Sequence, residues 1–316
     1  MKRNLLGGIA AIVALALAGA AKAETKTLAF VVNGASDFWK AAEAGVKKAQ
    51  GELPNYKLVF KYPESASAAV QQRLMDDLVA AGVAGIMVSP DDPKHSTEAL
   101  NRIGGQVALF TTDSDAPDSR RIAYIGSSNV EAGKQAGQLM LKALPNGGKC
   151  IAFVGILAND NARERVEGIK AAIAGSKIEI IDIREDDIDM ARAKRNVEDA
   201  LSAHPDIDCL AGLYSYNTPR IYEVLKESGK LGQIKIIGFD EDPITLGGVK
   251  EGSIVGTVVQ QPFEWGYQGM KDMAKYLEGD KSFIPENKLI IIPTEVIEQG
   301  NVDAFWAELK ARQAAK

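Results

Sequence analysis

Five polar residues of this chain stand where a parallel β-sheet would hold a ligand. Asp113 and Asp240 come just after short apolar runs, Asn217 and Gln260 follow two further runs, and Arg165 lies near the start of a helical stretch. Carboxylates, amides and guanidinium groups are planar, and they make directed hydrogen bonds, often in pairs. A hydroxyl both donates and accepts, so it pairs with a carboxylate on one side and an amide or guanidinium on the other. The set therefore suits a small neutral sugar better than an anion.

Two consecutive aromatic residues, Phe38 and Trp39, stand at the first turn of a helix expected over 37–50. Consecutive helical side chains point about 100° apart, so we expect one ring in the core and the other at a ligand cleft. Aromatic faces cover the C–H surface of a sugar ring. The alternative is that both rings serve the core alone.

Several of these polar residues also have ordinary structural explanations. Arg163 and Arg165 both lie in the first turns of a helix expected over 162–174, where surface salt bridges are common. Asn217 either caps the following helix or binds a ligand, and Gln260 either faces the cleft or lies in a solvated turn. These alternatives stay open from the residues alone.

The residues that follow Asp240 favour a ligand-binding role for it. Asp242 precedes Pro243, a pair typical of a helix N-cap and first turn, so Asp240 is left for a ligand. His95 and His204 lie far apart, and no spacing resembles a metal site, a phosphate loop, a nucleophile elbow or a dinucleotide fingerprint. We therefore expect no metal, no cofactor and no catalytic residue, with a two-carboxylate carbohydrate-active enzyme as the alternative.

The elements that position these residues alternate between strand and helix. The strand-like runs form two series, 28–32, 57–61, 85–88, 107–111 and 122–125, then 151–154, 178–183, 209–213 and 235–239. Amphipathic helices separate the runs, including those expected over 191–203 and 219–228. This alternation predicts an α/β fold with two parallel sheets, whose ligands bind at the carboxyl ends of the strands.

Short extended segments at 123–126, 257–260 and 289–292 are interpreted as crossings between two lobes, which together make a hinge. The fold class is thus two doubly wound parallel-sheet lobes joined by three crossings. The predicted division is a signal peptide over 1–23, an N-terminal lobe over 24–126 plus 261–290, and a C-terminal lobe over 127–260 plus 291–316.

The first residues have the pattern of a secretory signal peptide. Lys2 and Arg3 precede an apolar stretch over 5–18, and Ala21 and Ala23 supply the small residues of a cleavage site. The apolar stretch is shorter than the ~20 residues of a spanning helix. We expect an exported protein without a lipid anchor, and an N-terminal membrane anchor is the alternative.

Composition excludes some partners and leaves one pair of cysteines open. The chain is 46% hydrophobic and 25% charged with a net charge of −5, which argues against nucleic acid as a partner. No later stretch predicts a membrane span. If Cys150 and Cys209 begin neighbouring parallel strands in register, their Cα atoms lie about 5 Å apart, within reach of a disulfide. The alternative is two buried thiols.

The chain resembles the periplasmic sugar-binding proteins of ABC importers, in the type I group that includes the ribose-binding protein. The resemblance extends over nearly all of the expected mature chain. It rests on five motifs in a fixed order: Leu28-Ala29-Phe30-Val31-Val32 followed by Phe38-Trp39, Ile86-Met87-Val88-Ser89-Pro90, Ala162-Arg163-Glu164-Arg165-Val166-Glu167-Gly168, Ile237-Gly238-Phe239-Asp240, and Val259-Gln260-Gln261-Pro262.

The resemblance implies a two-lobed protein that closes on its ligand about a hinge. The ligand-binding positions that it implies are Ser36, Phe38, Trp39, Asp113, Arg165, Asp240 and Gln260, with Asn217 carried over less securely. Ser114 stands where the ribose protein has Arg, which puts a pentose ligand in doubt.

The implied function is that of a monomeric periplasmic receptor that delivers a monosaccharide to an inner-membrane ABC permease and is not an enzyme. Sugar-responsive transcription regulators resemble the same fold and are an alternative, as is a receptor that serves chemotaxis. The regulators carry a helix-turn-helix before the first lobe, whereas here the expected signal peptide leads straight into the first strand.

Overall fold

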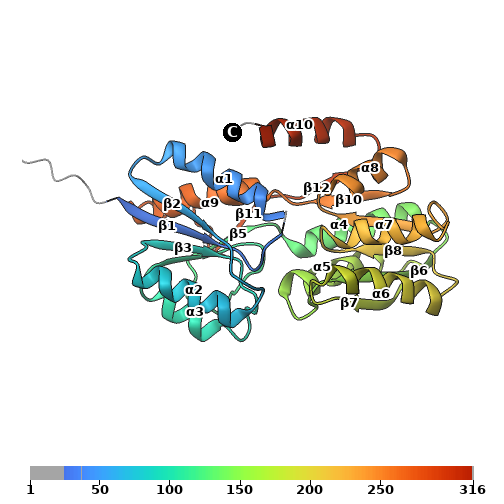
Figure 1. Ribbon diagram of the computed structural model, residues 1–316, viewed down its shortest axis with the longest axis horizontal. Helices are drawn as coiled ribbons and strands as arrows, with labels where there is room; N and C mark the ends of the chain where they lie inside the picture. Colours follow the sequence, from blue (N-terminus) through green and yellow to red (C-terminus); the bar gives the residue numbers. More distant parts are fainter. Residues whose placement is uncertain (1–24, 37, 315–316) are drawn as a thin grey trace, which may run out of the picture.

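The computed structural model describes residues 25–36 and 38–314, so the expected signal peptide over 1–23 lies outside the described residues. Two six-stranded sheets, each with helices on both faces, form two lobes that lie side by side (Figure 1). The predicted α/β fold with two parallel-sheet lobes is confirmed. Strands that are covered on both faces of a parallel sheet are apolar along their length, and the fully buried runs 85–88, 108–111 and 209–212 have this composition.

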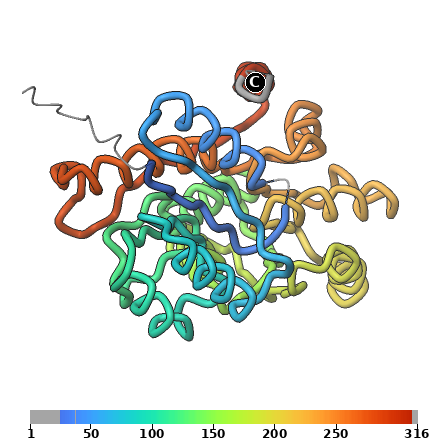
Figure 2. The backbone as a smooth tube through the Cα atoms, turned by 60° about the vertical axis from the view of Figure 1, so that its left-hand side comes forward, coloured from blue at the N-terminus to red at the C-terminus, as the bar shows by residue number. Residues whose placement is uncertain are grey.

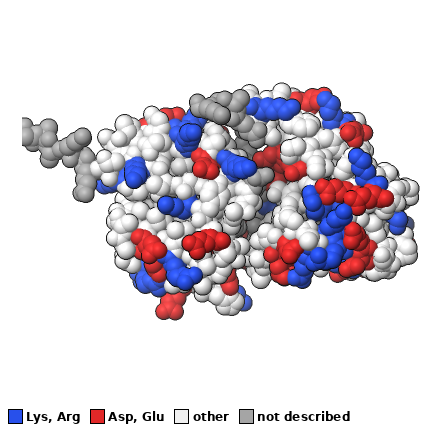
Figure 3. Space-filling view, viewed as in Figure 1, with Lys and Arg blue, Asp and Glu red and all other residues white. Residues whose placement is uncertain are grey.

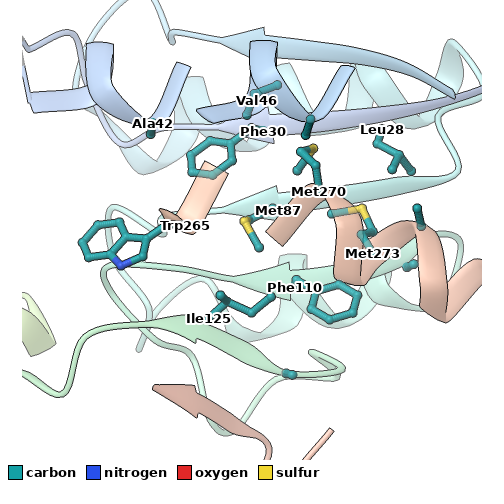
Figure 4. Packing of buried hydrophobic residues seen from close by; sticks show 14 of the residues in the cluster. Leu28, Phe30, Ala42, Val46, Met87, Phe110, Ile125, Trp265, Met270 and Met273 are labelled. Atoms are coloured by element: carbon teal, nitrogen blue, oxygen red, sulfur yellow. The ribbon is translucent and has the colours of Figure 1, made fainter. Parts of the chain in front are cut away.

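The first lobe is built on one sheet and four helices. Its strands, in order across the sheet, are β11 (Leu289–Ile291), β5 (Tyr124–Gly126), β4 (Ala108–Thr111), β3 (Gly85–Val88), β1 (Lys26–Val31) and β2 (Tyr56–Lys61). Its helices are α1 (Phe38–Glu52), α2 (Ala68–Ala80), α3 (Thr97–Gly104) and α9 (Pro262–Leu277). Figure 4 shows the core between this sheet and the helices α1 and α9, where Phe30, Met87 and Trp265 are buried.

The second lobe repeats this arrangement with different residues. Its strands, in order, are β12 (Glu295–Ile297), β10 (Gly256–Val259), β9 (Lys235–Phe239), β8 (Cys209–Gly212), β6 (Gly148–Val154) and β7 (Ile178–Glu185). Its helices are α4 (Asn129–Ala143), α5 (Asp160–Ile173), α6 (Met190–Ala203), α7 (Asn217–Glu227), α8 (Pro243–Glu251) and α10 (Val302–Ala314). The edge strand β12 is antiparallel to β10, a departure from the all-parallel expectation.

The chain passes between the lobes three times. The segments that we expected to be crossings are themselves the strands β5, β10 and β11, and each crossing follows directly after one of them. Hence residues just beyond these strands lie at the hinge. The residue boundaries of the lobes given above stay predictions.

Glycines allow the helices of each lobe to pack closely. A Cβ at Gly133 of α4 would lie 2.1 Å from the carbonyl oxygen of Arg165 on α5, and one at Gly266 of α9 would lie 2.1 Å from that of Ala42 on α1. No side chain fits at such distances. These two helix pairs occupy equivalent places in their lobes, and the first pair brings Arg165 to the hinge side of α5.

The last helix, α10, lies outside the layers of the two lobes, on the same side of the molecule as α1 and α8 (Figures 1 and 2). Its residues Phe305, Trp306 and Leu309 pack against the core of the second lobe, and Asp303 pairs with Lys250 of α8 at 2.6 Å. No helix among the described residues is long and apolar enough to cross a membrane.

The two cysteines are partners in the sheet. Cys150 of β6 lies directly opposite Cys209 of β8 in a parallel pair, as a disulfide would require. Both residues are buried, and both are free thiols in this structure. A hydrogen bond with the neighbouring Cys150, together with burial, raises the pKa of the Cys209 thiol well above its ordinary value, which disfavours the thiolate. The structure thus contains the second of the two alternatives, a pair of buried thiols.

Candidate functional site

A cavity of about 660 Å³ opens between the lobes, where the loops after the strands of both sheets meet. Its lining from the first lobe is Asn33, Gly34, Ala35, Ser36, Phe38, Trp39, Pro63, Glu64, Ser65, Ala66 and Asp113. Its lining from the second lobe and the hinge is Asn161, Arg165, Asp187, Ile188, Met190, Tyr214, Ser215, Tyr216, Asp240, Asp242 and Gln260. Figure 3 shows acidic side chains on both lobes beside the boundary between them. All of the expected ligand-binding residues except Asn217 line this cavity.

Asp113 lies two residues beyond β4 and is held by donors from several elements. It is 5% exposed, and its Oδ2 accepts from Ser89 Oγ at 2.9 Å and from Asn33 Nδ2 at 3.4 Å. Burial raises the pKa of its carboxyl, while Arg165 and hydrogen bonds from Ser89 and Asn161 oppose that rise. Because Asn161 and Arg165 belong to the other lobe, the pKa of Asp113 depends on residues across the cavity.

Asp240 follows β9 directly and faces the cavity from the second lobe. It is 3% exposed, and its Oδ1 accepts from Gln260 Nε2 at 3.1 Å. Thr257 Oγ1 donates to its backbone carbonyl at 2.8 Å, which fixes the turn. Burial raises the pKa of Asp240 to about 6, with Arg165 and Gln260 opposing the rise and Asp113 adding to it. The expected N-cap role of the nearby Asp242 is confirmed, because its Oδ1 accepts from Ile244 N at 2.8 Å.

Arg165 of α5 lines the cavity, acts electrostatically on both carboxylates and is only 1% exposed. Its Nε donates to Asn129 Oδ1 at 3.0 Å, and its Nη1 donates to the carbonyl of Leu213 at 2.5 Å. The guanidinium carbon lies 4.7 Å from the centre of the Phe239 ring, a cation–π contact. These contacts fix the guanidinium plane, so a ligand meets a preorganised donor.

Arg163, the other arginine of this helix, has the ordinary role expected for its position. It forms a surface ion pair with Asp160, and its Nη1 donates to the carbonyl of Ala158 at 2.7 Å. It is not among the residues that line the cavity.

An aromatic wall closes the first-lobe side of the cavity. Trp39 is 2% exposed and belongs to the core, whereas Phe38 is half-buried, so the two consecutive rings differ in burial as their helical positions predict. Trp39 Nε1 donates to Asn33 Oδ1 at 3.0 Å, and both rings contact Trp265 of α9. The wall is therefore fixed to the helix that follows the second crossing.

A second aromatic pair, Tyr214 and Tyr216, covers the opposite side. Their rings stack with centres 6.1 Å apart. Tyr214 Oη donates to Asn161 Oδ1 at 2.9 Å, and Tyr216 Oη donates to Asp186 Oδ1 at 2.6 Å. Asp186 is fully buried, and burial raises the pKa of its carboxyl to about 6.

Asn217 lies behind this wall and not in the lining. Its Nδ2 donates to Asp186 Oδ2 at 2.7 Å, and its Oδ1 accepts from Tyr214 N at 3.1 Å. Both the oxygen and the nitrogen of the Asn217 amide group thus form hydrogen bonds within its own lobe. In this structure Asn217 holds the tyrosine loop in position, and Tyr216 lies in the lining; ligand binding by Asn217 stays a prediction.

Several lining residues were missed from the sequence. Asn33, Asn161, Tyr214 and Tyr216 all follow strand ends, so their position was a signal, but nothing local showed which side chain of each loop turns inward. Ser89 lies outside the lining and acts through its bond to Asp113. What the set has in common is hydrogen-bonding capacity between aromatic faces, which is the chemistry of polyhydroxylated ligands.

Nothing in the cavity resembles a metal centre. Within residues 25–36 and 38–314, no group of three or more His, Cys, Asp or Glu side chains is arranged to hold a metal ion.

Known proteins share this fold and sequence pattern. The "Ribose import binding protein RbsB" of Salmonella typhimurium is 27% identical over 284 residues, which cover 89% of this chain and 95% of that protein. A solute-binding protein of an ABC transporter from Burkholderia graminis, solved in complex with D-arabinose, has 28% identity and a TM-score of 0.83 and covers 88% of this chain and 97% of its own. GanP, a glucose-galactose binding protein from Geobacillus stearothermophilus, has 29% identity and a TM-score of 0.82. The match covers 88% of this chain and 99% of GanP.

The family itself is shown by a match to most of the chain. The model of the periplasmic binding protein domain matches residues 28–281. Members of this family bind ligands for transport and are not enzymes, so the prediction that the chain is not an enzyme is confirmed. With the two-lobed fold and the cavity between the lobes, this match shows that the chain belongs to the family of periplasmic binding proteins.

Proposed function

We propose that this protein captures a monosaccharide between its two lobes and delivers it to an inner-membrane ABC permease. The observation that carries the proposal is a single cavity to which both lobes contribute buried polar groups. Asp113 comes from the first lobe, and Arg165 and Asp240 come from the second. The sugar-binding names of the relatives reported above support the same ligand class.

The mechanism follows from where these groups lie. A ligand shifts a two-state equilibrium only by binding one state more tightly, so closure needs contacts that form only when the lobes meet. Asp113 accepts hydrogen bonds from one face of a sugar, while Arg165 donates from the other. Phe38 and Tyr216 cover its C–H surfaces. The closed form is then the form that the permease recognises.

We further propose that the protein acts as a monomer in the periplasm. The support is the signal-peptide pattern over residues 1–23 together with the family. A cleaved leader would leave a mature chain that starts at Glu24. Mass spectrometry of the protein recovered from the periplasm tests the cleavage site.

The test of the binding site is a calorimetric titration of the purified mature protein against a panel of monosaccharides and inositol. We expect at least one neutral member to bind with one site per chain, and Asp113→Asn and Asp240→Asn to weaken that binding at least tenfold. The matched control is Asp76→Asn, because Asp76 lies on the surface, away from the cavity lining, and pairs with Arg102. Unchanged affinity in both cavity variants would reject the site, and failure of every sugar and cyclitol to bind would reject the function.

A further inference from the structure

The charges that line the cavity do not balance. Five of the lining side chains are carboxylates, namely Glu64, Asp113, Asp187, Asp240 and Asp242. Arg165 is the one cationic side chain among the described residues of the lining. An anionic ligand would meet repulsion from both lobes, while a neutral ligand would leave the excess negative charge in place.

Three of the five carboxylates pair with other groups or are exposed to solvent. The excess negative charge therefore lies with the two buried carboxylates, in the inner part of the cavity. Asp187 forms an ion pair with Arg192, Asp242 caps α8, and Glu64 is exposed. Asp113 and Asp240 are buried and share Arg165. Two buried carboxylates therefore face one guanidinium, and burying an uncompensated charge is costly.

The two inner carboxylates differ in how well they are satisfied. The carboxylate of Asp113 receives hydrogen bonds from two residues, Ser89 and Asn33. Among the residues that the structure describes, the carboxylate of Asp240 receives them from Gln260, through its side chain and its backbone. The carboxylate of Asp240 thus depends on one donor residue, whereas that of Asp113 is held by two.

The side chain of Gln260, which is bonded to Asp240, has an acceptor atom without a donor. Its side chain is 3% exposed, and its Oε1 has no hydrogen-bond partner among the residues that the structure describes. The same amide group donates to Asp240 through Nε2. A buried acceptor without a donor is rare in proteins and costs free energy. One group that donates several hydrogen bonds and carries a positive charge would satisfy both the carboxylate and this amide oxygen.

We propose that the cavity prefers a polyhydroxylated ligand with one ammonium group, an amino sugar or an aminocyclitol, over its neutral counterpart, with the ammonium between Asp240 and Gln260 Oε1. This inference rests on the proposed function, because it assigns the ligand class of the same cavity. An ammonium has three donors and no acceptor, so it suits two neighbouring acceptors better than a hydroxyl does. Its positive charge, added to that of Arg165, also balances the two negative charges of Asp113 and Asp240.

The experiment compares matched ligands that differ in one group. Calorimetric titrations at pH 7 use D-glucose, D-glucosamine and D-glucuronate, then D-galactose, D-galactosamine and D-galacturonate, then an inositol and its inosamine. We expect the amine of at least one set to bind about tenfold or more tighter than its neutral partner, since hydrogen bonds between charged groups are roughly twice as strong as neutral ones. The carboxylate member should bind weakest.

Two variants test the placement of the ammonium. Asp240→Asn keeps the shape and the backbone conformation, and we expect it to abolish the preference for the amine while some affinity for the neutral sugar remains. Asp113→Asn is the matched comparison, and it should weaken the amine and the neutral ligand by similar factors. Thermal unfolding of both variants verifies that they are folded.

The outcomes separate this inference from the proposed function. Neutral members that bind as tightly as their amines, or more tightly, would overturn the ammonium preference and leave monosaccharide binding supported. If the Asp240→Asn variant still binds the amine more tightly than the neutral sugar, the ammonium does not lie at Asp240. Absence of binding by every neutral, amine and carboxylate member would overturn both.

Discussion

Asp113 and Asp240 occupy equivalent positions in the two lobes and face each other across the cavity. Each follows the third strand of its sheet, β4 in one lobe and β9 in the other. Each has a left-handed backbone, with φ of 58° at Asp113 and 64° at Asp240. Both carboxylates are influenced by the same guanidinium, that of Arg165. The site is thus nearly symmetric in its carboxylates and asymmetric in its single cation.

The left-handed backbone at these two positions predicts different results for two kinds of substitution. Asn adopts positive φ more readily than other residues that have a side chain, whereas Ala does so at a cost of about 1 kcal/mol. We expect Asp113→Ala and Asp240→Ala to unfold at lower temperatures than the corresponding Asn variants, although all four lose sugar affinity. Thermal unfolding without ligand measures this difference, and equal midpoints for Ala and Asn would contradict it.

Close packing of α4 on α5 predicts that a methyl group at Gly133 acts on the site from a distance. The added Cβ would lie 2.1 Å from the carbonyl oxygen of Arg165, so the helices must separate. We expect Gly133→Ala to lower the free energy of unfolding by about 1–3 kcal/mol and to weaken sugar binding. Gly247→Ala is the control, because a methyl group at this position of α8 would have no other atom within 4 Å. It should be neutral or stabilising by up to about 1 kcal/mol.

Ile188 lines the cavity with an unusual backbone for a β-branched residue, with φ of 61°. Its amide donates to Asp186 Oδ1 at 2.9 Å, which holds the loop in this conformation. We expect Ile188→Gly to be more stable than Ile188→Ala by about 1 kcal/mol, because both remove the side chain but only Gly is free of the left-handed strain. Chemical denaturation of the two variants gives the difference. An Ala variant as stable as the Gly variant would show that the strain is absent.

The buried carboxyl group of Glu241 leads us to expect that the free energy of unfolding depends on pH. Its side chain lines a small pocket below α10 together with Glu295 and Glu308, and its Oε2 is buried without a hydrogen-bond partner among the described residues. Burial raises the pKa of Glu241 to about 8, and Asp240 and Asp242 add to the rise. Between its ordinary value of 4.5 and this value, the folded state holds a proton that the unfolded state has lost. The contribution of Glu241 to stability therefore falls as pH rises through this window, and the loss is complete above it.

We expect Glu241→Gln to raise the free energy of unfolding by about 1–3 kcal/mol at pH 9 and to change it little at pH 4, where the carboxyl is protonated in both states. Denaturant unfolding at a series of pH values measures this. Glu286→Gln is the control, because Glu286 is exposed. A gain that is the same at both pH values would contradict the argument.

Much of the fold follows from local sequence patterns. The runs 107–111 and 235–239 are short, apolar and followed by Asp, so strands that end at a ligand site were predictable. The helices expected over 162–174 and 191–203 correspond to α5 (Asp160–Ile173) and α6 (Met190–Ala203) within a few residues. Such patterns are reliable because the periods of strands and helices are set by neighbouring residues in the chain.

The direction of single side chains was not predictable in the same way. The helix expected over 219–228 begins two residues earlier, as α7 (Asn217–Glu227), and this turns Asn217 toward Asp186 and leaves Tyr216 in the lining. A shift of one helical residue rotates a side chain by about 100°, far more than a boundary prediction can resolve.

The sequence by itself determined two lobes, their strands, and polar and aromatic residues at the strand ends. Only the tertiary structure decided that Arg165 acts on both Asp113 and Asp240, and that Gln260 Oε1 is left without a donor among the described residues. The reason is physical: burial and charge balance depend on distances between segments far apart in the chain, and these distances are fixed by the packing of the lobes.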